Sequence, residues 1–271
     1  MKDSVLMTLY NRPHLVLLNT LTALGKNDLS NTEIVIVDDG STVDYSAIQE
    51  AYAALPLKWV RVDTVKDRPD TYNLDGYNNP SYAWNQALAA AEGENIHILS
   101  SDTLLPPHAL ASARKRMLNK VVYCGMVVDM DTANEYLGQQ RVAPLGWFLS
   151  TTKTQLKKIS DSKGNAWDEA YLNGIAFEDN DFTARLALNV GRVIVDLSVC
   201  CWHQSHPQTA YSDDMKGWKA NEAYTLQKWG GIPWSHLKWH SGHEDPLKSM
   251  DVTTVGPTLH VDLSKVQVGT C

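Results

Sequence analysis

Short apolar runs rich in β-branched residues alternate with helix-forming stretches through the first half of the chain. Such runs, when turn residues bound them, are typical of buried strands. Strands are predicted at 4–10, 33–37, 58–62, 96–99 and 121–128, and helices at 13–24, 46–54, 81–91 and directly after Pro106-Pro107. The alternation predicts an α/β fold in which helices flank a mostly parallel, Rossmann-like central sheet.

Polar clusters follow three of the predicted strands. They are Tyr10-Asn11-Arg12, Asp38-Asp39-Gly40-Ser41 and Ser100-Ser101-Asp102. Ligands of open α/β sheets bind beyond the carboxyl ends of the strands. We therefore expect all three clusters to line one crevice.

Length and composition exclude several other classes of protein. The chain has 271 residues, 44% of them hydrophobic, which suffices for one large domain with or without a small appendage. Its formal net charge of −7 does not favour long-range attraction to nucleic acid or anionic lipid. No apolar run approaches the roughly 20 residues of a membrane-spanning helix, so we expect no membrane span and a cytoplasmic location. Four cysteines without zinc-site spacing are expected to be reduced thiols: Cys124, Cys200, Cys201 and Cys271.

Carboxylates at the strand ends suit two kinds of ligand. Asp38 and Asp39 can accept hydrogen bonds from ribose hydroxyls or a base N–H, but an ordinary turn with capping side chains explains them equally well. Asp102 can hold a divalent cation on a diphosphate, or it can cap a helix. Two histidines, His203 and His206, can complete such a metal site, although a pair of this kind is more often structural or exposed.

An acidic cluster opens a helix that is predicted at 178–188. Glu178, Asp179 and Asp181 all fall in its first turn, where the helix dipole favours negative charge. One of them can instead be the general base that takes a proton from an acceptor hydroxyl. We expect Asp181 to serve only the helix start. A strand at 193–199 and a helix at 216–229 complete the second half, which is loop-rich after Gly230-Gly231.

Five segments, taken in order, resemble the inverting GT-A glycosyltransferases of family 2. They are 4–12 (SVLMTLYNR), 33–41 (EIVIVDDGS), 82–101 (YAWNQALAAAEGENIHILSS), 167–186 (WDEAYLNGIAFEDNDFTARL) and 201–207 (CWHQSHP). The resemblance lies in order and spacing rather than in one motif, and it covers about residues 3–235. It implies that a sugar passes from a nucleotide-diphosphate sugar, with a UDP-sugar favoured, to an acceptor hydroxyl. Inversion and a divalent metal, Mn²⁺ or Mg²⁺, are implied as well.

The resemblance also implies roles for individual residues. Asp179 is implied as the catalytic base, and Glu178 is implied to help position the acceptor. The implied metal ligands are Asp102 and either His203 or His206. The implied donor site consists of Thr8, Tyr10, Asp38, Asp39, Asn85, Ser101 and Asp102.

Two positions depart from the family pattern. Ser100 replaces the first acid of the Asp-x-Asp metal motif, and Trp84 stands where an arginine usually precedes Asn85. The Ser100 departure supports an alternative function, a catalytically weak or inactive GT-A-fold protein that binds a nucleotide sugar or a glycan. A nucleotidyltransferase would need a glycine- and lysine-rich phosphate loop, and residues 1–12 contain none.

The resemblance divides the chain into three parts. We expect a GT-A domain at 1–235, with a donor half at 1–105 and an acceptor and catalytic half at 106–235, and then a C-terminal extension at 236–271. Trp202, Trp218 and Trp234 can line the acceptor site or simply pack in the core. A glycan, a protein and a hydroxymethylated nucleic-acid base are all possible acceptors, and the acidic charge makes the last less favoured.

Overall fold

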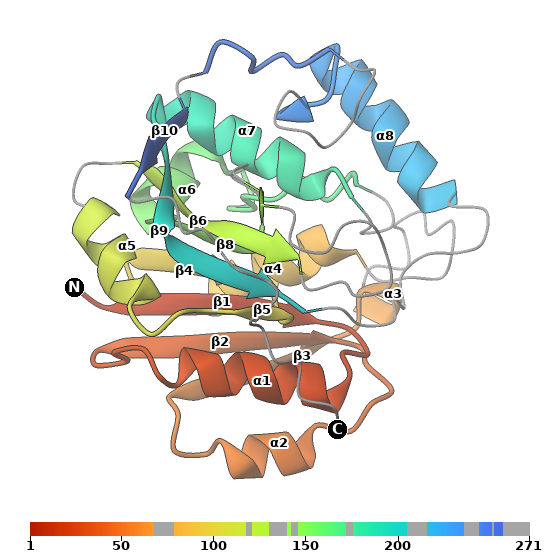
Figure 1. Ribbon diagram of the computed structural model, residues 1–271. Coiled ribbons are helices and arrows are strands. Elements are labelled where there is room, and N and C mark those ends of the chain that lie inside the picture. The colour runs from red at the N-terminus through yellow and green to blue at the C-terminus, as the bar shows by residue number, and fades with distance from the viewer. Residues whose placement is uncertain are drawn as a thin grey trace.

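A computed structural model describes the chain at 1–67, 79–117, 121–129, 140–141, 146–171, 176–204, 216–235, 244–250 and 252–256. These residues form a mixed α/β structure around one central sheet (Figure 1). The predicted α/β class with a mostly parallel, helix-flanked sheet is confirmed.

The sheet has ten strands in the described part of the chain, and its main path runs β10-β9-β6-β8-β4-β1-β2-β3. Parallel pairs join β1 to β2 and β4, β2 to β3, and β9 to β6 and β10. Strand β8 is antiparallel to both of its neighbours, β4 and β6. The strands are β1 Asp3–Leu9, β2 Thr32–Asp39, β3 Leu57–Val62, β4 Asn95–Leu99, β5 Thr103–Leu104, β6 Val122–Asp129, β7 Gln140–Arg141, β8 Phe148–Thr152, β9 Val193–His203 and β10 Val252–Val255.

Helices cover both faces of the sheet and divide its core in two. Alternate residues of each strand point to opposite faces, so Ile34 and Ile36 pack with α1, α2 and α5, whereas Val35 and Val37 share the core of α4, α6 and α7. Figure 1 shows α1 and α2 below the sheet and α7 above it. The helices are α1 His14–Leu24, α2 Ser46–Ala51, α3 Thr64–Asp67, α4 Pro80–Ala90, α5 Ala109–Met117, α6 Lys153–Ile159, α7 Glu178–Val190 and α8 Lys216–Trp229.

Several elements differ from the sequence-based expectation. Strand β9 does not stop at residue 199 but continues to His203, and a register shift against β6 falls between Gly125 and Met126. Strand β8 and helix α6 were not predicted. Strand β10 lies within the range predicted as a C-terminal extension, yet it pairs with β9. The sheet therefore reaches into that range.

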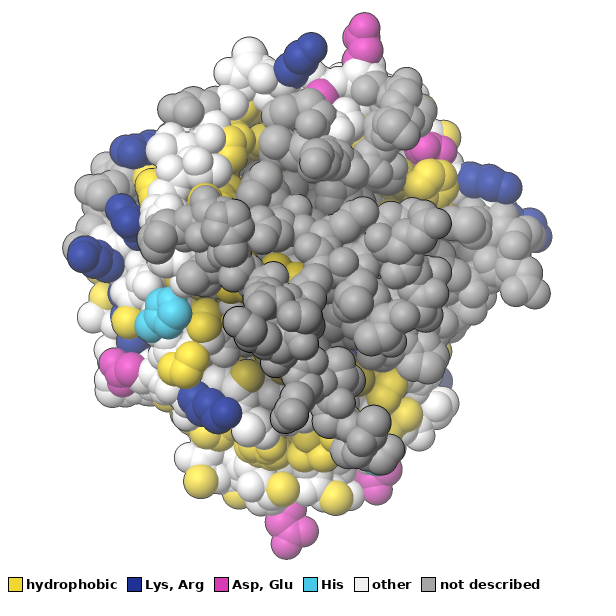
Figure 2. Space-filling model, in the orientation of Figure 1, with side chains coloured by type: hydrophobic (Ala, Val, Ile, Leu, Met, Phe, Trp, Pro, Cys, Tyr) yellow, Lys and Arg dark blue, Asp and Glu magenta, His cyan; other side chains and the backbone are white. Residues whose placement is uncertain are grey.

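Free cysteines and surface charges of both signs characterise the described residues. Cys124, Cys200 and Cys201 are buried and free, and Cys271 lies outside the described residues. In the face that Figure 2 shows, described Lys and Arg side chains are spread around the outline with Asp and Glu among them. None of the described helices has the length and hydropathy to cross a bilayer.

Candidate active site

Asn11 joins the end of β1 to the turn that follows β2. Its backbone N–H donates to the Ser41 hydroxyl at 2.8 Å, and its side-chain oxygen accepts the backbone N–H of Thr42, also at 2.8 Å. The residue has φ of 47°, a left-handed conformation that asparagine tolerates better than most residues. The first two polar clusters are thereby held together.

Arg12 makes the corresponding link from β1 to the end of β4. Its Nε donates to the Ser101 hydroxyl at 3.1 Å, and its Nη1 forms an ion pair with Oδ2 of Asp102 at 2.9 Å. All three polar clusters therefore lie side by side at the carboxyl ends of their strands, as the sequence predicts.

Asp102 lies beside His203 because β5 pairs with the last residues of β9. Thr103 stands opposite His203 in that pairing, and the distance from Asp102 Oδ2 to His203 Nε2 is 3.5 Å. The Ser100 hydroxyl donates to Oδ1 of Asp102 at 2.6 Å, so the residue at the first-acid position supports the acid that is retained. Asp102 is only 4% exposed. His206, the alternative ligand, lies outside the described residues.

A carboxylate oxygen suits Mn²⁺ or Mg²⁺, and an imidazole nitrogen beside it favours the transition metal Mn²⁺. Within the described ranges, no group of three His, Cys, Asp or Glu side chains could hold a metal ion. Mg²⁺-type sites commonly combine one or two protein ligands with substrate phosphates and water. Asp102 and His203 therefore fit a cation that is shared with a bound diphosphate, and fit poorly a cation held by protein alone.

The two acids that end β2 point to opposite faces of the sheet. Asp38 accepts the backbone N–H of Ser41 at 3.0 Å and pairs with Arg61, so its carboxylate holds the turn. Asp39 continues the row of alternate residues that faces α4 and α7, and it accepts both the backbone N–H and the hydroxyl of Thr64, at 2.8 and 2.7 Å. Of the pair, only Asp39 therefore faces the half of the molecule that carries the acidic cluster.

Burial raises the pKa of Asp39 to about 6. The bonds from Thr64 act in the opposite direction, and the charges of Asp63 and Asp38 add to the rise. Because the folded protein keeps this proton longer than the unfolded chain does, the stabilising contribution is complete below about pH 4 and is lost as pH rises through 6. Asp39→Asn removes this term.

As pH rises from 4 to 7, we expect the unfolding free energy of wild type to fall relative to that of Asp39→Asn. The change should not exceed about 3 kcal/mol. Urea unfolding followed at several pH values measures it. A difference that stays constant across this range would contradict the raised pKa.

A cavity of about 400 Å³ opens on the face opposite to Asp39. Its lining includes Asp38, Arg61 and the stacked rings of Tyr45 and Trp59, whose centroids are 6.1 Å apart. The cavity lies beside α2, and so it does not coincide with the convergence of Arg12, Asp102 and His203.

Helix α7 begins directly after two left-handed residues. Ala176 has φ of 67° and Phe177 has φ of 73°, an unfavourable conformation for residues with a side chain. Phe177 is fully buried, and its ring centroid lies 5.0 Å from that of Trp218 in an edge-to-face arrangement. This packing holds the strained start in place. Glu178 and Asp179 follow as the first helical residues.

Glu178 carries a carboxyl group that is shielded from water. Its Oε2 is buried and has no hydrogen-bond partner among the described residues. Burial, and secondly the neighbouring charge of Asp179, hold the pKa of Glu178 well above its ordinary value. Two adjacent carboxyl groups in such a place do not both ionise readily, so Glu178 keeps its proton more readily than an ordinary glutamate.

Gly146 and Trp147, which directly precede β8, connect the acidic cluster to the Asp102 region. A Cβ atom on Gly146 would lie 3.6 Å from Cβ of Asp179. The Trp147 carbonyl accepts the backbone N–H of Ser100 at 3.0 Å, and its ring lies 6.0 Å from the ring of His203. Because β8 was not predicted, these two residues were not expected in the site.

Three further residues were predicted in the donor site: Asn85, Thr8 and Tyr10. The Asn85 amide donates to the Trp167 carbonyl at 3.0 Å and to Glu169 at 2.9 Å, and its oxygen accepts the Trp167 N–H at 2.9 Å. Asn85 thus anchors the segment ahead of α7. Thr8 and Tyr10 are part-exposed at the end of β1.

Of the three tryptophans proposed for the acceptor site, one is a core residue. Trp234 is fully buried and donates to the Thr183 hydroxyl at 3.0 Å, which is core packing. Trp218 packs against Phe177, and Trp202 is half-buried near the end of β9. Core packing therefore accounts for Trp234.

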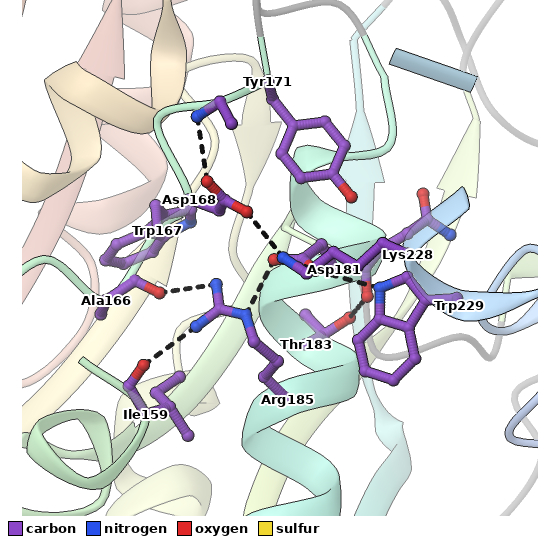
Figure 3. Close-up of polar contacts among 12 residues, drawn as sticks. Ile159, Ala166, Trp167, Asp168, Tyr171, Asp181, Thr183, Arg185, Lys228 and Trp229 are labelled. Carbon is purple, nitrogen blue, oxygen red and sulfur yellow. Dashed lines mark hydrogen bonds and ion pairs between the residues drawn. The ribbon is translucent and has the colours of Figure 1, made fainter. Parts of the chain in front are cut away.

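Asp181 does more than serve the start of the helix. It is fully buried on α7, and its carboxylate receives Arg185 Nε at 2.8 Å, Lys228 Nζ at 2.6 Å and Trp229 Nε1 at 3.0 Å. Lys228 also pairs with Asp168, at 2.6 Å. Figure 3 shows Lys228 and Arg185 converging on Asp181. These contacts join α7 to α8 and to the segment that contains Asp168, and the sequence-based expectation for Asp181 is wrong.

Comparisons with known proteins agree with this fold. The family model described as Glycosyl transferase family 2 matches residues 4–171. The fold is similar to that of S. aureus TarS 1–349 in complex with UDP-GlcNAc, with a TM-score of 0.58 and 20% identity over 83% of this chain and 67% of that one. It is also similar to the mannosyltransferase PcManGT from Pyrobaculum calidifontis in complex with GDP-Man and Mn²⁺, with a TM-score of 0.55 and 17% identity over 92% of this chain and 67% of that one. No curated protein matches the sequence.

Proposed function

Because this chain belongs to glycosyltransferase family 2 and has the GT-A fold, we propose that it transfers a sugar from a nucleotide-diphosphate sugar to an acceptor hydroxyl with inversion. The observation that carries the proposal is the meeting of two chemical centres at one edge of the sheet. Asp102 and His203 form the first, Glu178 and Asp179 form the second, and Trp147 lies between them.

Asp179 is the general base of the proposed reaction. Burial, and secondly the charge of Asp179, raise the pKa of its neighbour Glu178, so Asp179 is the carboxylate of the pair that more readily stays ionised and can accept a proton. As Asp179 takes the hydroxyl proton, the acceptor oxygen bonds to the anomeric carbon from the face opposite the nucleotide. The bond from that carbon to the diphosphate oxygen breaks, and the diphosphate leaves with the electron pair.

The first centre, Asp102 with His203, binds the leaving group. A divalent cation, when bound, neutralises the negative charge that develops on the departing diphosphate. Asp102 and His203 would hold it, with Ser100 orienting the carboxylate of Asp102. His206 stays a predicted ligand. The positive charge of Arg12 lies at the same point and adds to the stabilisation.

In this proposal the donor nucleotide also meets residues from the neighbouring strand ends. Asp39 is the acid placed to meet the base or ribose, and Tyr10 and Thr8 extend from the adjacent strand end. Asp38 holds the turn that shapes this site. The donors found in the similar structures, UDP-GlcNAc and GDP-Man, are the first candidates to test, with UDP-sugars favoured. The acceptor would approach Asp179 from the side of Gly146.

Asp102→Ala tests the proposal. We expect it to lower the rate of nucleotide release from UDP-GlcNAc or GDP-Man by at least about 100-fold, because the leaving group loses its charge partner. Asp161→Ala is the matched control: it removes the same charge from an exposed loop and should keep the wild-type response to Mn²⁺. Coupled detection of free nucleotide, with and without EDTA, measures both.

Two outcomes would count against this account. Undiminished wild-type activity in EDTA would remove the metal from it. Binding of a donor in a thermal-shift assay, without any donor hydrolysis in Mn²⁺, would instead favour the catalytically inactive binding protein that Ser100 first suggested. A ligand at 100 times its dissociation constant adds roughly 2.7 kcal/mol, enough for a clear thermal shift.

A further inference from the structure

Three buried aromatic rings form a stack, the aromatic stack, that joins α4 to α7: Trp84, Trp167 and Phe182. The ring centroid of Trp167 lies 5.6 Å from that of Trp84 on α4, with 15° between the planes. It lies 4.0 Å from that of Phe182 on α7, with 6° between the planes. Close-packed interiors are hard to compress and transmit displacement. A shift of one helix is therefore passed to the other through these rings.

Hydrogen bonds fix the middle of the stack to α4. The Asn85 side chain accepts the backbone N–H of Trp167 at 2.9 Å and donates to the Trp167 carbonyl at 3.0 Å. Asn79, which caps the start of α4, donates to the carbonyl of Glu169 at 3.0 Å. The chain at 167–169 therefore keeps a fixed place against α4.

Helix α4 in turn rests on the strands of the proposed donor site. Its Ala83 and Ala87 share one core cluster with Leu6 of β1 and with Val35 and Val37 of β2. These two strands lead to the polar clusters that meet the nucleotide in the proposed reaction. The position of the donor site is thus carried through α4 to the aromatic stack.

The other end of the stack lies one helical turn from the proposed general base. Phe182 is three residues after Asp179 on α7, and residues with this spacing are neighbours on the helix surface. One turn further, Arg185 Nη2 donates at 2.8 Å to the carbonyl of Ala166, the residue before Trp167 (Figure 3). The first turns of α7 are therefore seated against the same segment that α4 holds.

We propose that Trp84 is a positioning residue, which acts through the aromatic stack to set the distance between the donor site and Asp179. The proposal rests on the proposed function. It gives a role to the residue that departs from the family pattern at this position, since a buried ring supplies packing rather than a donor contact. Such a role can have a large effect, because a misplacement of about 1 Å can cost roughly 100-fold in rate.

Trp84→Leu tests the proposal, because leucine fills part of the space but cannot stack. We expect the rate of sugar transfer or donor hydrolysis at saturating donor to fall roughly 10- to 100-fold. The dissociation constant for UDP in Mn²⁺, measured by calorimetry, should stay within about twofold of wild type. Trp84→Phe keeps a ring and should restore most of the rate. Phe182→Leu removes the ring at the other end of the stack and should give the same split between rate and affinity, which keeps the test decisive if Trp84→Leu does not fold.

A double variant shows whether Trp84 acts through Asp179. The base is already lost in Asp179→Asn, so adding Trp84→Leu should lower the remaining rate by less than about threefold. A general weakening of the fold, or an effect on the donor site, would act independently and multiply the two losses. Multiplied losses would therefore overturn the proposal.

Trp59→Leu is the matched control. It also removes a tryptophan from a stacked pair, formed with Tyr45, but this pair packs against the opposite face of the sheet. The rate should stay within about twofold of wild type. Equal losses in Trp84→Leu and Trp59→Leu would overturn the proposal. Failure of the proposed function has a different signature, since the wild type itself would then release no nucleotide from UDP-GlcNAc or GDP-Man.

Discussion

Asp179→Asn should lower the rate of sugar transfer, or of donor hydrolysis, by roughly 10²–10⁴-fold, the usual contribution of a general base. Asparagine keeps the size of the side chain and its capacity to accept the Asn180 N–H, but it cannot take a proton. The dissociation constant for UDP should barely change, because the proposed donor contacts lie near Asp39 and Asp102. Steady-state kinetics at saturating donor and calorimetric titration with UDP separate the two effects.

Glu178→Gln is the companion variant. If Glu178 works with its proton in place, glutamine imitates it, since both are neutral groups with a hydrogen-bond donor. We therefore expect less than a tenfold loss of rate. An inactive Glu178→Gln beside an active Asp179→Asn would reverse the two roles.

Asp181→Asn should have its large effect on stability instead of on chemistry. Its carboxylate receives Arg185, Lys228 and Trp229 in a fully buried position, and asparagine can neither match the charge nor accept all three donors. Removing one partner of a buried ion pair costs about 3–5 kcal/mol; because both basic side chains are partly exposed, we expect about 3 kcal/mol. The melting temperature should fall by roughly 6–12 °C.

The same helix provides the control for this variant. Asp179→Asn, two residues earlier, should change the unfolding free energy by no more than about 1 kcal/mol, the size of a helix-dipole contribution. A double-mutant cycle of Asp181→Asn with Lys228→Met should give a coupling energy of at least about 1 kcal/mol. Equal stability of the Asp179 and Asp181 variants would show that the contacts in Figure 3 contribute little.

Sequence patterns were sufficient for the fold and for the edge at which the site lies. The alternation of strands and helices fixes a largely parallel sheet, and in such a sheet the polar residues after β1, β2 and β4 must meet. The links that Asn11 and Arg12 make between those strand ends confirm that expectation.

Other features depend on contacts that no local pattern encodes. The opposite orientations of Asp38 and Asp39 could have been expected from strand alternation, but only if β2 were known to continue through both of them. The burial of Asp181 depends on α8, whose Lys228 is far away in sequence. The pairing of β5 with β9, which places His203 beside Asp102, requires β9 to run four residues past the apolar run.

The reversed direction of β8 has a consequence for how such an enzyme can diversify. Because β8 runs against β4 and β6, its first residues lie at the edge where the parallel strands finish. Side chains can therefore be exchanged at Gly146 and Trp147 without shifting the register of the parallel strands that lead to Asp39 and Asp102. In the proposed transferase, recognition of the acceptor can drift from one relative to the next while the machinery for the nucleotide is inherited unchanged.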